Sequence, residues 1–451
     1  MGNNQHANKQ TRLASTLHSY HRATQALMQL KGVFRSLEIF DFRTTRSGRP
    51  FSSWGPITTP DFSVVNAVTS IALEPPQEED LGQPDSLHVA ISPTPPPVFT
   101  PPPPATDATT SQSRDKLRSK LRRAKARLTA KESRDPLKDP PPHKHLRHII
   151  RGSTAPIHSK IQLAKTRITA PGWLGLQGDK GGDRGVHTLD YFFGPNARRS
   201  GFTLVKAPES NQPRPVVDVD KKVYAVYGSM PEDANFKRDV HDPAVAALEA
   251  ARHLRLSPQS NPAFIRLAGF ATGLFANWAP NVFSFYIDYM SDFYARYPDL
   301  LRPFKNSIWS ACTFNLGPRT YTLGHRDSAN LAFGWCAITA LGHFDYTKGG
   351  HLILWDSKLI LEFPPGCTIL VPSAAIFHSN ITVGVNETRY SFTQYTAGGL
   401  FRWVEHDFKS ELDYFAGMTA DEVEKERLLG LQRAVVGAGL FSTLDELLEE
   451  D

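Results

Sequence analysis

Two side chains that could hold one metal ion stand two positions apart in residues 324–330. His325 and Asp327 would lie on the same side of an extended chain, or across a tight bend, so both could bind the same ion. A His–carboxylate pair and one distant His form the ligand set of non-haem iron(II) sites, which leaves the opposite face of the ion open. Because an H-x-D pattern also arises by chance, the surrounding sequence decides whether this is a site.

Four later histidines could supply the third ligand: His343, His351, His378 and His406. His378 is favoured because it follows a tight turn at residues 364–366 and a predicted strand at 367–371. It should therefore lie one hairpin away from the sheet that would hold His325. The sequence predicts a metal site made of His325, Asp327 and His378.

Arg389 and Ser391 stand on what the sequence predicts to be the next strand. Residues two apart on a strand face the same side, so both could reach one ligand. A 2-oxoglutarate cosubstrate would bind iron through its keto-acid end, and its far carboxylate would then need a bidentate cation and a hydroxyl. Arg389 and Ser391 offer these two groups, which favours an oxygenase site.

Short strands dominate the sequence from Ser307 onward and indicate an antiparallel sandwich or jelly roll. They are rich in β-branched and aromatic residues and are bounded by Gly or Pro, at residues 308–314, 331–340, 351–355, 358–363, 367–371 and 389–395. Earlier strands are predicted at residues 191–193, 202–205 and 223–227. These strands would supply the framework for the metal site.

Helices are predicted before and after the strands. They occupy residues 243–256 after a cap at Asp242, residues 277–302, and residues 420–434 and 443–450. We expect the first two to pack on the back of the sheet and the last two to cover an open edge. The expected fold class is α+β, with a jelly-roll core of antiparallel strands flanked by helices.

The composition divides the chain into three parts. Residues 1–110 are rich in Pro, Ser, Thr and Asp, which predicts a mostly disordered region. Residues 111–168 read as a basic linker segment, and residues 169–451 as the folded domain with its C-terminal helices. The catalytic residues predicted above all fall in the third part.

The basic run at residues 114–128 has three interpretations: a solvated linker, a nuclear-localisation or nucleic-acid-binding patch, and a membrane-surface or calmodulin-type helix.

The net charge of +6 favours an acidic partner. Three cysteines without a C-x-x-C motif indicate a reducing compartment. No apolar stretch reaches the roughly 18 residues of a membrane helix, so no membrane association is expected. A nuclear location is expected from the basic run.

A wider pattern joins the chemical residues. His325-x-Asp327 is followed by a Gly-Gly-His at 349–351, a Pro-Gly at 365–366, His378 and Arg389-x-Ser391, in an order that resembles the double-stranded β-helix of 2-oxoglutarate/Fe(II) dioxygenases. Residues 315–320, 325–330 and 395–403 are similar to the TET/JBP family of nucleic-acid-base dioxygenases, especially its compact fungal members. The resemblance covers roughly residues 170–410.

The resemblance implies both cofactors and substrate. Fe(II) would be held by His325, Asp327 and His378, and 2-oxoglutarate by Arg389 with help from Ser391 and Asn315, with O2 as the oxidant. The implied activity is oxidation of 5-methylcytosine in duplex DNA to hydroxymethyl-, formyl- and carboxylcytosine by a monomeric catalytic domain, after the base is flipped out. Alternatives are N6-methyladenine or another methylated base in DNA or RNA, a protein hydroxylase, and an inactive nucleic-acid-binding fold.

The substrate contacts are predicted from the same resemblance. The residue three positions after the metal Asp contacts the target cytosine in this family, which implies that role for Asn330. Tyr395, Phe401 and Trp403 are candidates to stack on the flipped base, although aromatic residues near strand ends are more often core. Arg184 is a candidate phosphate contact.

Overall fold

The computed structural model describes residues 155–449 except 167, 177–182, 184, 196, 210–211, 232 and 255–257, and before them 43–44, 50–51, 119, 122–123, 126–127, 129–130, 132–141 and 150. The chain divides into two units, Met1–Gln25 with Asp115–Asp451, and Ala26–Arg114. In the second unit, strands β1 (Arg43–Thr44) and β2 (Pro50–Phe51) pair antiparallel. Most of the predicted disordered region lies outside the described residues.

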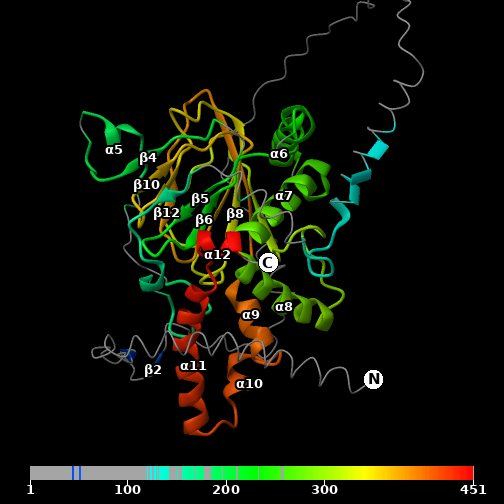
Figure 1. The fold of residues 1–451 in the computed structure, drawn as a ribbon, viewed down its shortest axis with the longest axis vertical. Coiled ribbons are helices and arrows are strands. Elements are labelled where there is room, and N and C mark those ends of the chain that lie inside the picture. The colour runs from blue at the N-terminus through cyan, green and yellow to red at the C-terminus, as the bar shows by residue number, and fades with distance from the viewer. Residues whose placement is uncertain are drawn as a thin grey trace, which may run out of the picture. The chain divides into compact units, whose positions relative to one another are not determined.

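Two β-sheets form the centre of the first unit (Figure 1). The larger has seven strands in the order β3 (Ile157–His158), β5 (Arg214–Val217), β6 (Val223–Tyr227), β11 (Thr368–Val371), β8 (Cys336–His343), β13 (Thr388–Tyr395) and β7 (Ala311–Asn315). The smaller has four in the order β12 (His378–Asn380), β9 (Leu352–Leu354), β10 (Leu359–Leu361) and β4 (Thr203–Val205). All neighbours pair antiparallel except β3 with β5 and β4 with β10.

The chain passes back and forth between the two sheets. Strand β8 lies in the larger sheet, and the next two strands, β9 and β10, lie in the smaller. Strand β11 returns to the larger sheet, β12 lies in the smaller, and β13 is again in the larger. Leu352, Leu354 and Leu361 from the smaller sheet share one buried core with Ile369 and Val371 from the larger. The result is a mixed α+β fold with two face-packed, mainly antiparallel sheets, which agrees with the sandwich expected from the sequence.

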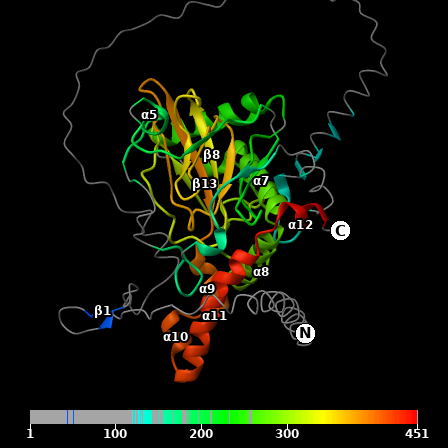
Figure 2. The ribbon, with the colours of Figure 1, turned by 60° about the vertical axis from the view of Figure 1, so that its left-hand side comes forward.

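Helices cover the other face of the larger sheet (Figure 2). The helices with defined bounds are α5 (Asp190–Phe193), a π-helix (Lys237–His241), α6 (Asp242–Leu254), α7 (Pro262–Trp278), α8 (Pro280–Arg296), α9 (Gly398–Glu405), α10 (Glu411–Phe415), α11 (Ala420–Gly439) and α12 (Leu444–Glu449), with short 3-10 turns at Leu163–Lys165 and Pro258–Ser260. The described residues between 119 and 133, Glu132 among them, are also helical. Leu248 of α6 and Phe264 of α7 pack with Tyr390 and Phe392 of β13. The opposite face of β13 is thereby left for Arg389 and Ser391.

Several elements differ from the sequence prediction. Residues 191–193 form the short helix α5 and not a strand, because Phe192 turns inward to pack on Trp355 and Phe202. The helix predicted at 277–302 is α8, which begins at Pro280 and ends at Arg296, because proline fits the first turn of a helix. Helix α7, which precedes it, was not predicted. Strand β3 shows that the larger sheet includes residues from the predicted linker segment.

The expectation that the C-terminal helices cover an open sheet edge stays a prediction, but the residues between α11 and α12 pair with the start of β6 through Thr443 and Lys222. Thr419 caps α11 and forms a reciprocal capping box with Glu422. The backbone N–H of Val223 donates to the Ser442 carbonyl, so this part of the chain meets the start of β6, an interior strand. In the views of Figures 1 and 2, α10 and α11 extend away from the sheets. Among the described residues, no helix combines the length and the apolarity that a membrane crossing requires.

The buried His351 is expected to make the fold sensitive to mild acid. Its complete burial lowers its pKa to about 4, against weaker opposing effects of the Gly349 backbone and Asp345. Because the unfolded chain takes up the proton near pH 6.5, the stability that neutral His351 provides is complete above that pH and is lost as pH falls toward 4. At pH 5 the loss is about 2 kcal/mol in the free energy of unfolding.

Urea unfolding at pH 7 and pH 5 tests this prediction. The fall in unfolding free energy between the two pH values should be about 2 kcal/mol smaller in His351→Leu than in the unchanged protein. Burial also lowers the pKa of His406 to about 4, but that contribution is common to both proteins and cancels in the comparison. An equal fall in both proteins would contradict the assignment to His351.

Candidate metal centre

His325 and His378 lie directly opposite each other on two paired backbone segments. The N–H of His325 donates to the His378 carbonyl (3.0 Å), and the N–H of His378 donates to the His325 carbonyl (2.9 Å). Residues that exchange both hydrogen bonds in an antiparallel pair project their side chains to the same face. The imidazole centroids accordingly lie 4.3 Å apart. Since His378 begins β12, which pairs with β9, the smaller sheet fixes both rings.

Asp327 completes a three-ligand group. Its backbone N–H donates to the Ser373 carbonyl (3.0 Å), and its carboxylate oxygens lie 3.4 Å from His325 Nε2 and 4.0 Å from His378 Nε2. The three ligand atoms all lie within 4.8 Å of one another, and no other group of three His, Cys, Asp or Glu residues in the described part of the chain could hold a metal ion. The structure thus brings together the three ligands predicted from the sequence.

The second nitrogen of each imidazole fixes which nitrogen faces the site. His325 Nδ1 lies 2.8 Å from the Leu323 carbonyl oxygen, and His378 Nδ1 lies 3.0 Å from the Ile376 carbonyl oxygen. A carbonyl oxygen only accepts, so each Nδ1 carries the hydrogen and donates it. Each Nε2 then faces Asp327 and is the nitrogen that can bind a metal ion, which is the arrangement that metal-binding histidines adopt.

The charge states of the ligands suit a cation. Burial raises the pKa of Asp327, but the hydrogen bond with His325 and the charges of both histidines outweigh burial and bring the pKa below its usual value. Burial lowers the pKa of His378, which keeps that imidazole neutral. Burial also acts to lower the pKa of His325, but its contacts with Asp327 raise it overall, so a metal would displace a proton there.

The donor set fits Fe(II). An octahedral ion about 2.1 Å from each ligand places neighbouring ligand atoms about 3 Å apart, so the separations of 3.4 Å and 4.0 Å from Asp327 would shorten when the ion binds. Two neutral imidazoles and one carboxylate on one side of the ion are the facial ligand set of non-haem Fe(II) enzymes. Three protein ligands with an open position also occur in catalytic zinc sites, and replacing Fe(II) with Zn(II) distinguishes the two metals.

Arg389 is a buried cation without an acidic partner in the described residues. Its side chain is 3% exposed, and burial lowers its pKa to about 10. One guanidinium nitrogen donates to the Thr320 carbonyl (3.0 Å), while the buried Nε has no hydrogen-bond partner. A buried charge of this kind is costly unless a ligand of opposite charge pairs with it. Arg389 therefore fits a carboxylate of a bound small molecule.

Ser391 lies on the same face of β13 as Arg389 and is also buried. Its hydroxyl oxygen accepts a hydrogen bond from the Asn315 side-chain amide (2.8 Å) across the β7–β13 pair. Because the oxygen accepts from Asn315, the hydroxyl hydrogen remains available to an anion. The three residues predicted to hold 2-oxoglutarate are thus brought together.

One short segment connects Arg389 to the metal ligands. The Thr320 carbonyl accepts from Arg389, the Thr322 N–H donates to the Asn380 side chain (2.7 Å), and His325 pairs with His378. Gly324 is required just before His325, since a Cβ there would lie 2.5 Å from both the Asp183 carbonyl oxygen and the Phe377 ring. The backbone of residues 320–325 therefore ties the buried cation to the metal centre.

Asn330 lies beside the metal ligands. Its side-chain amide donates to the Ser373 hydroxyl (3.2 Å), and its backbone N–H donates to the Asp327 carbonyl (2.9 Å). Tyr395 ends β13, with its hydroxyl 3.2 Å from the Thr313 hydroxyl. Arg184 lies outside the described residues. The roles predicted for these three residues in substrate binding remain predictions.

The prediction that Phe401 stacks on a base is wrong. Its ring is 0% exposed and stacks on Phe285 at 5.5 Å between centroids, because the apolar face of α9 packs on α8. Trp403, also on α9, is partly buried, and its indole N–H donates to the Tyr297 hydroxyl (3.0 Å). Both aromatic side chains serve the packing of these two helices.

The sequence interpretation missed three residues that support the ligands. Ser373 contacts both Asp327 and Asn330, and Arg326 forms an ion pair with Asp356 (2.9 Å). The alternation of side chains along an extended segment could have indicated a supporting role for Arg326, because a residue between two ligands points to the side opposite the metal. No local signal marks Ser373 or Asp356.

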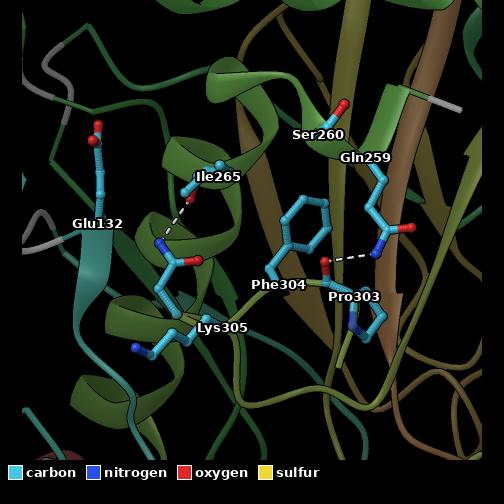
Figure 3. A pocket seen from close by; sticks show the side chains of 8 residues that line it. Glu132, Gln259, Ser260, Ile265, Pro303, Phe304 and Lys305 are labelled. Carbon is cyan, nitrogen blue, oxygen red and sulfur yellow. Dashed lines mark hydrogen bonds between the residues drawn. The ribbon is translucent and has the colours of Figure 1, made fainter. Parts of the chain in front are cut away.

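A cavity of about 500 Å³ lies elsewhere, between the helix that carries Glu132 and the loop at Pro303–Lys305 (Figure 3). Its wall includes Gln259, whose amide donates to the Pro303 carbonyl (2.7 Å). None of the residues predicted for metal, cosubstrate or substrate lines it. This cavity is therefore separate from the metal centre.

Comparisons with known proteins give only distant similarity. No family model matches the chain, and no curated protein matches it. Among solved structures, the chain is similar to NgTET1 in complex with 5mC DNA, with 12% identity and a TM-score of 0.32, over 44% of this chain and 83% of that one. That structure is of the family that the sequence resembles. In this chain, His325, Asp327 and His378 form a candidate Fe(II) centre in a mixed α+β fold.

Proposed function

We propose that the protein is a 2-oxoglutarate- and Fe(II)-dependent dioxygenase, built on a double-stranded β-helix, that oxidises 5-methylcytosine in DNA. The observation that carries the proposal is the combination of a two-His, one-carboxylate group with the buried Arg389, which has no acidic partner among the described residues. Metal sites without a cosubstrate have no need of such a cation. The pattern His325-x-Asp327, His378 and Arg389-x-Ser391 in the sequence supports the same reading.

The residues of the site have distinct roles in this reaction. His325, Asp327 and His378 would hold Fe(II) and leave its remaining positions open to ligands. Iron, when bound with 2-oxoglutarate and O2, supplies the oxidation of a methyl C–H bond coupled to decarboxylation of the keto acid. Arg389 and the Ser391 hydroxyl orient the far carboxylate of 2-oxoglutarate. Burial strengthens that ion pair by removing water from it.

DNA is the proposed partner. A methyl group of a stacked base is out of reach, so the target nucleotide must be flipped into the site. Asn330, next to the metal ligands, is the proposed contact to the base, and the +6 net charge favours binding to the phosphates. Stepwise oxidation to hydroxymethyl-, formyl- and carboxylcytosine and a nuclear location are part of the same proposal.

The test is product analysis with matched substrates. The purified full chain, given Fe(II), 2-oxoglutarate and O2, should convert 5-methylcytosine in a duplex to oxidised cytosines and form succinate in equal amount per oxidation. Parallel reactions should contain a duplex with N6-methyladenine, a methylated RNA and a peptide mixture. Nucleoside mass spectrometry identifies the products, and replacing Fe(II) with Zn(II) should stop the reaction.

Each alternative predicts a different result. Oxidation of N6-methyladenine or RNA with no oxidised cytosine would replace the proposed substrate but keep the chemistry. A hydroxylated peptide as the single product would exclude a nucleic-acid substrate. An active enzyme should bind Fe(II) and 2-oxoglutarate in its folded state and not when unfolded, so both should raise its melting temperature. If neither does, the inactive-fold alternative is favoured.

A further inference from the structure

Arg326 occupies the position between two metal ligands and points the other way. Its side chain is only 7% exposed, although His325 and Asp327 on either side remain partly exposed. Its Nε donates to the Ala375 carbonyl (2.9 Å), and its guanidinium lies 5.6 Å from the centre of the Phe377 ring. Both of these contacts fall on residues just before His378.

Asp356 joins the same two segments from the turn between β9 and β10. One carboxylate oxygen accepts from the Arg326 guanidinium (2.9 Å), and the other accepts from the backbone N–H of Phe377 (2.6 Å). The first bond fixes the segment of His325 and Asp327, and the second fixes the segment of His378. A single carboxylate thus contacts the neighbours of all three ligands.

We infer that the Arg326–Asp356 ion pair is a positioning pair that keeps the three ligands grouped and facing one another before the ion arrives. The inference rests on the metal centre of the proposed function and adds two residues to it. Ligands held in place by their supporting contacts lose less freedom when the ion binds, so affinity depends on those contacts. Loosening the pair should weaken metal binding even while the fold persists.

The chain contains a closely matched ion pair away from the metal ligands. Arg302 pairs with Asp135 (2.6 Å), and both side chains are about as buried as Arg326, at 10% and 11% exposed. Arg302 also donates to a backbone carbonyl, that of Ser307 (2.9 Å), and lies 5.6 Å from the centre of the Tyr294 ring. Asp135, like Asp356, accepts from a backbone N–H, here that of Leu137 (3.1 Å). Removing this pair should reproduce the general cost of losing a buried ion pair.

The test compares Arg326→Met with Arg302→Met in the full chain. Mn(II) serves as the probe, its dissociation constant is measured by calorimetry, and thermal unfolding is recorded without metal. Both substitutions should lower the melting temperature. Arg326→Met should also weaken Mn(II) binding by about 10- to 100-fold, the range found for residues that orient metal ligands. Arg302→Met should leave the dissociation constant unchanged.

A third variant guards against unfolding of Arg326→Met. Arg326→Lys keeps the charge opposite Asp356 but cannot reach Ala375 and Asp356 with a planar fork. It should fold and bind Mn(II) with an affinity between those of the unchanged protein and Arg326→Met. Unchanged Mn(II) affinity in the Arg326 variants, or equal weakening in Arg302→Met, would overturn the inference. No Mn(II) binding by the unchanged protein would overturn the metal centre itself, and the inference with it.

Discussion

Replacing His378 with Ala is expected to abolish oxidation of methylated DNA and to weaken Mn(II) or Fe(II) binding by more than about 100-fold. Losing a residue that only orients a metal ligand lowers metal affinity by about 10- to 100-fold, and losing the ligand itself should lower it further. His378 is one of the three candidate ligands, it is buried, and its Nε2 is directed at the site by the hydrogen bond from Nδ1 to the Ile376 carbonyl. Calorimetry gives the metal affinity, and mass spectrometry of nucleosides gives the activity.

His343→Ala is the matched control. His343 was one of the four candidate third ligands in the sequence, but it ends β8 with an exposed side chain and belongs to no ligand group in the described residues. Its replacement should leave metal affinity and oxidation unchanged. If His378→Ala keeps its metal affinity, or if His343→Ala loses it, the assignment of the third ligand is wrong.

The metal ligands could be predicted because the chemistry restricts the residue types and the strand alternation restricts the spacing. His325 and Asp327 are adjacent on one side of the chain, and Arg389 and Ser391 share one face of β13. Five of the seven strands of the larger sheet, β6, β7, β8, β11 and β13, were predicted for a similar reason, since their β-branched and aromatic runs are bounded by Gly and Pro, whereas β3 and β5 were not predicted. Gly366, with φ of 90° before β11, is one such boundary.

The features that could not be predicted from the sequence depend on contacts between residues far apart in the chain. Strand β12 is only His378–Asn380, three residues of polar character, and becomes a strand because β9 pairs with it. The aromatic residues of α5 favour a strand locally, but the packing of Phe192 on Trp355 selects a helical turn. Likewise Asp356 stands 30 residues after Arg326, and no local pattern connects the two.

Replacing Arg389 with Met is expected to raise the dissociation constant of 2-oxoglutarate, measured with Mn(II), by about 100- to 1000-fold, which corresponds to the roughly 3–4 kcal/mol lost when a buried ion pair is left with one member. The free protein should remain folded and at least as stable, because the buried Arg389 has no acidic partner among the described residues before the cosubstrate binds. Calorimetry with 2-oxoglutarate and urea unfolding without it measure these two effects.

Pyruvate separates the role of Arg389 from a general loss of the site. It shares the keto-acid end of 2-oxoglutarate but lacks the far carboxylate, so it should bind the unchanged protein weakly and Arg389→Met with the same weak affinity. The preference for 2-oxoglutarate over pyruvate should therefore largely disappear in Arg389→Met. Arg319→Met is the control, because Arg319 pairs with Arg389 through the backbone while its side chain is exposed, so that variant should keep the preference. A preference that survives in Arg389→Met would show that another group binds the far carboxylate.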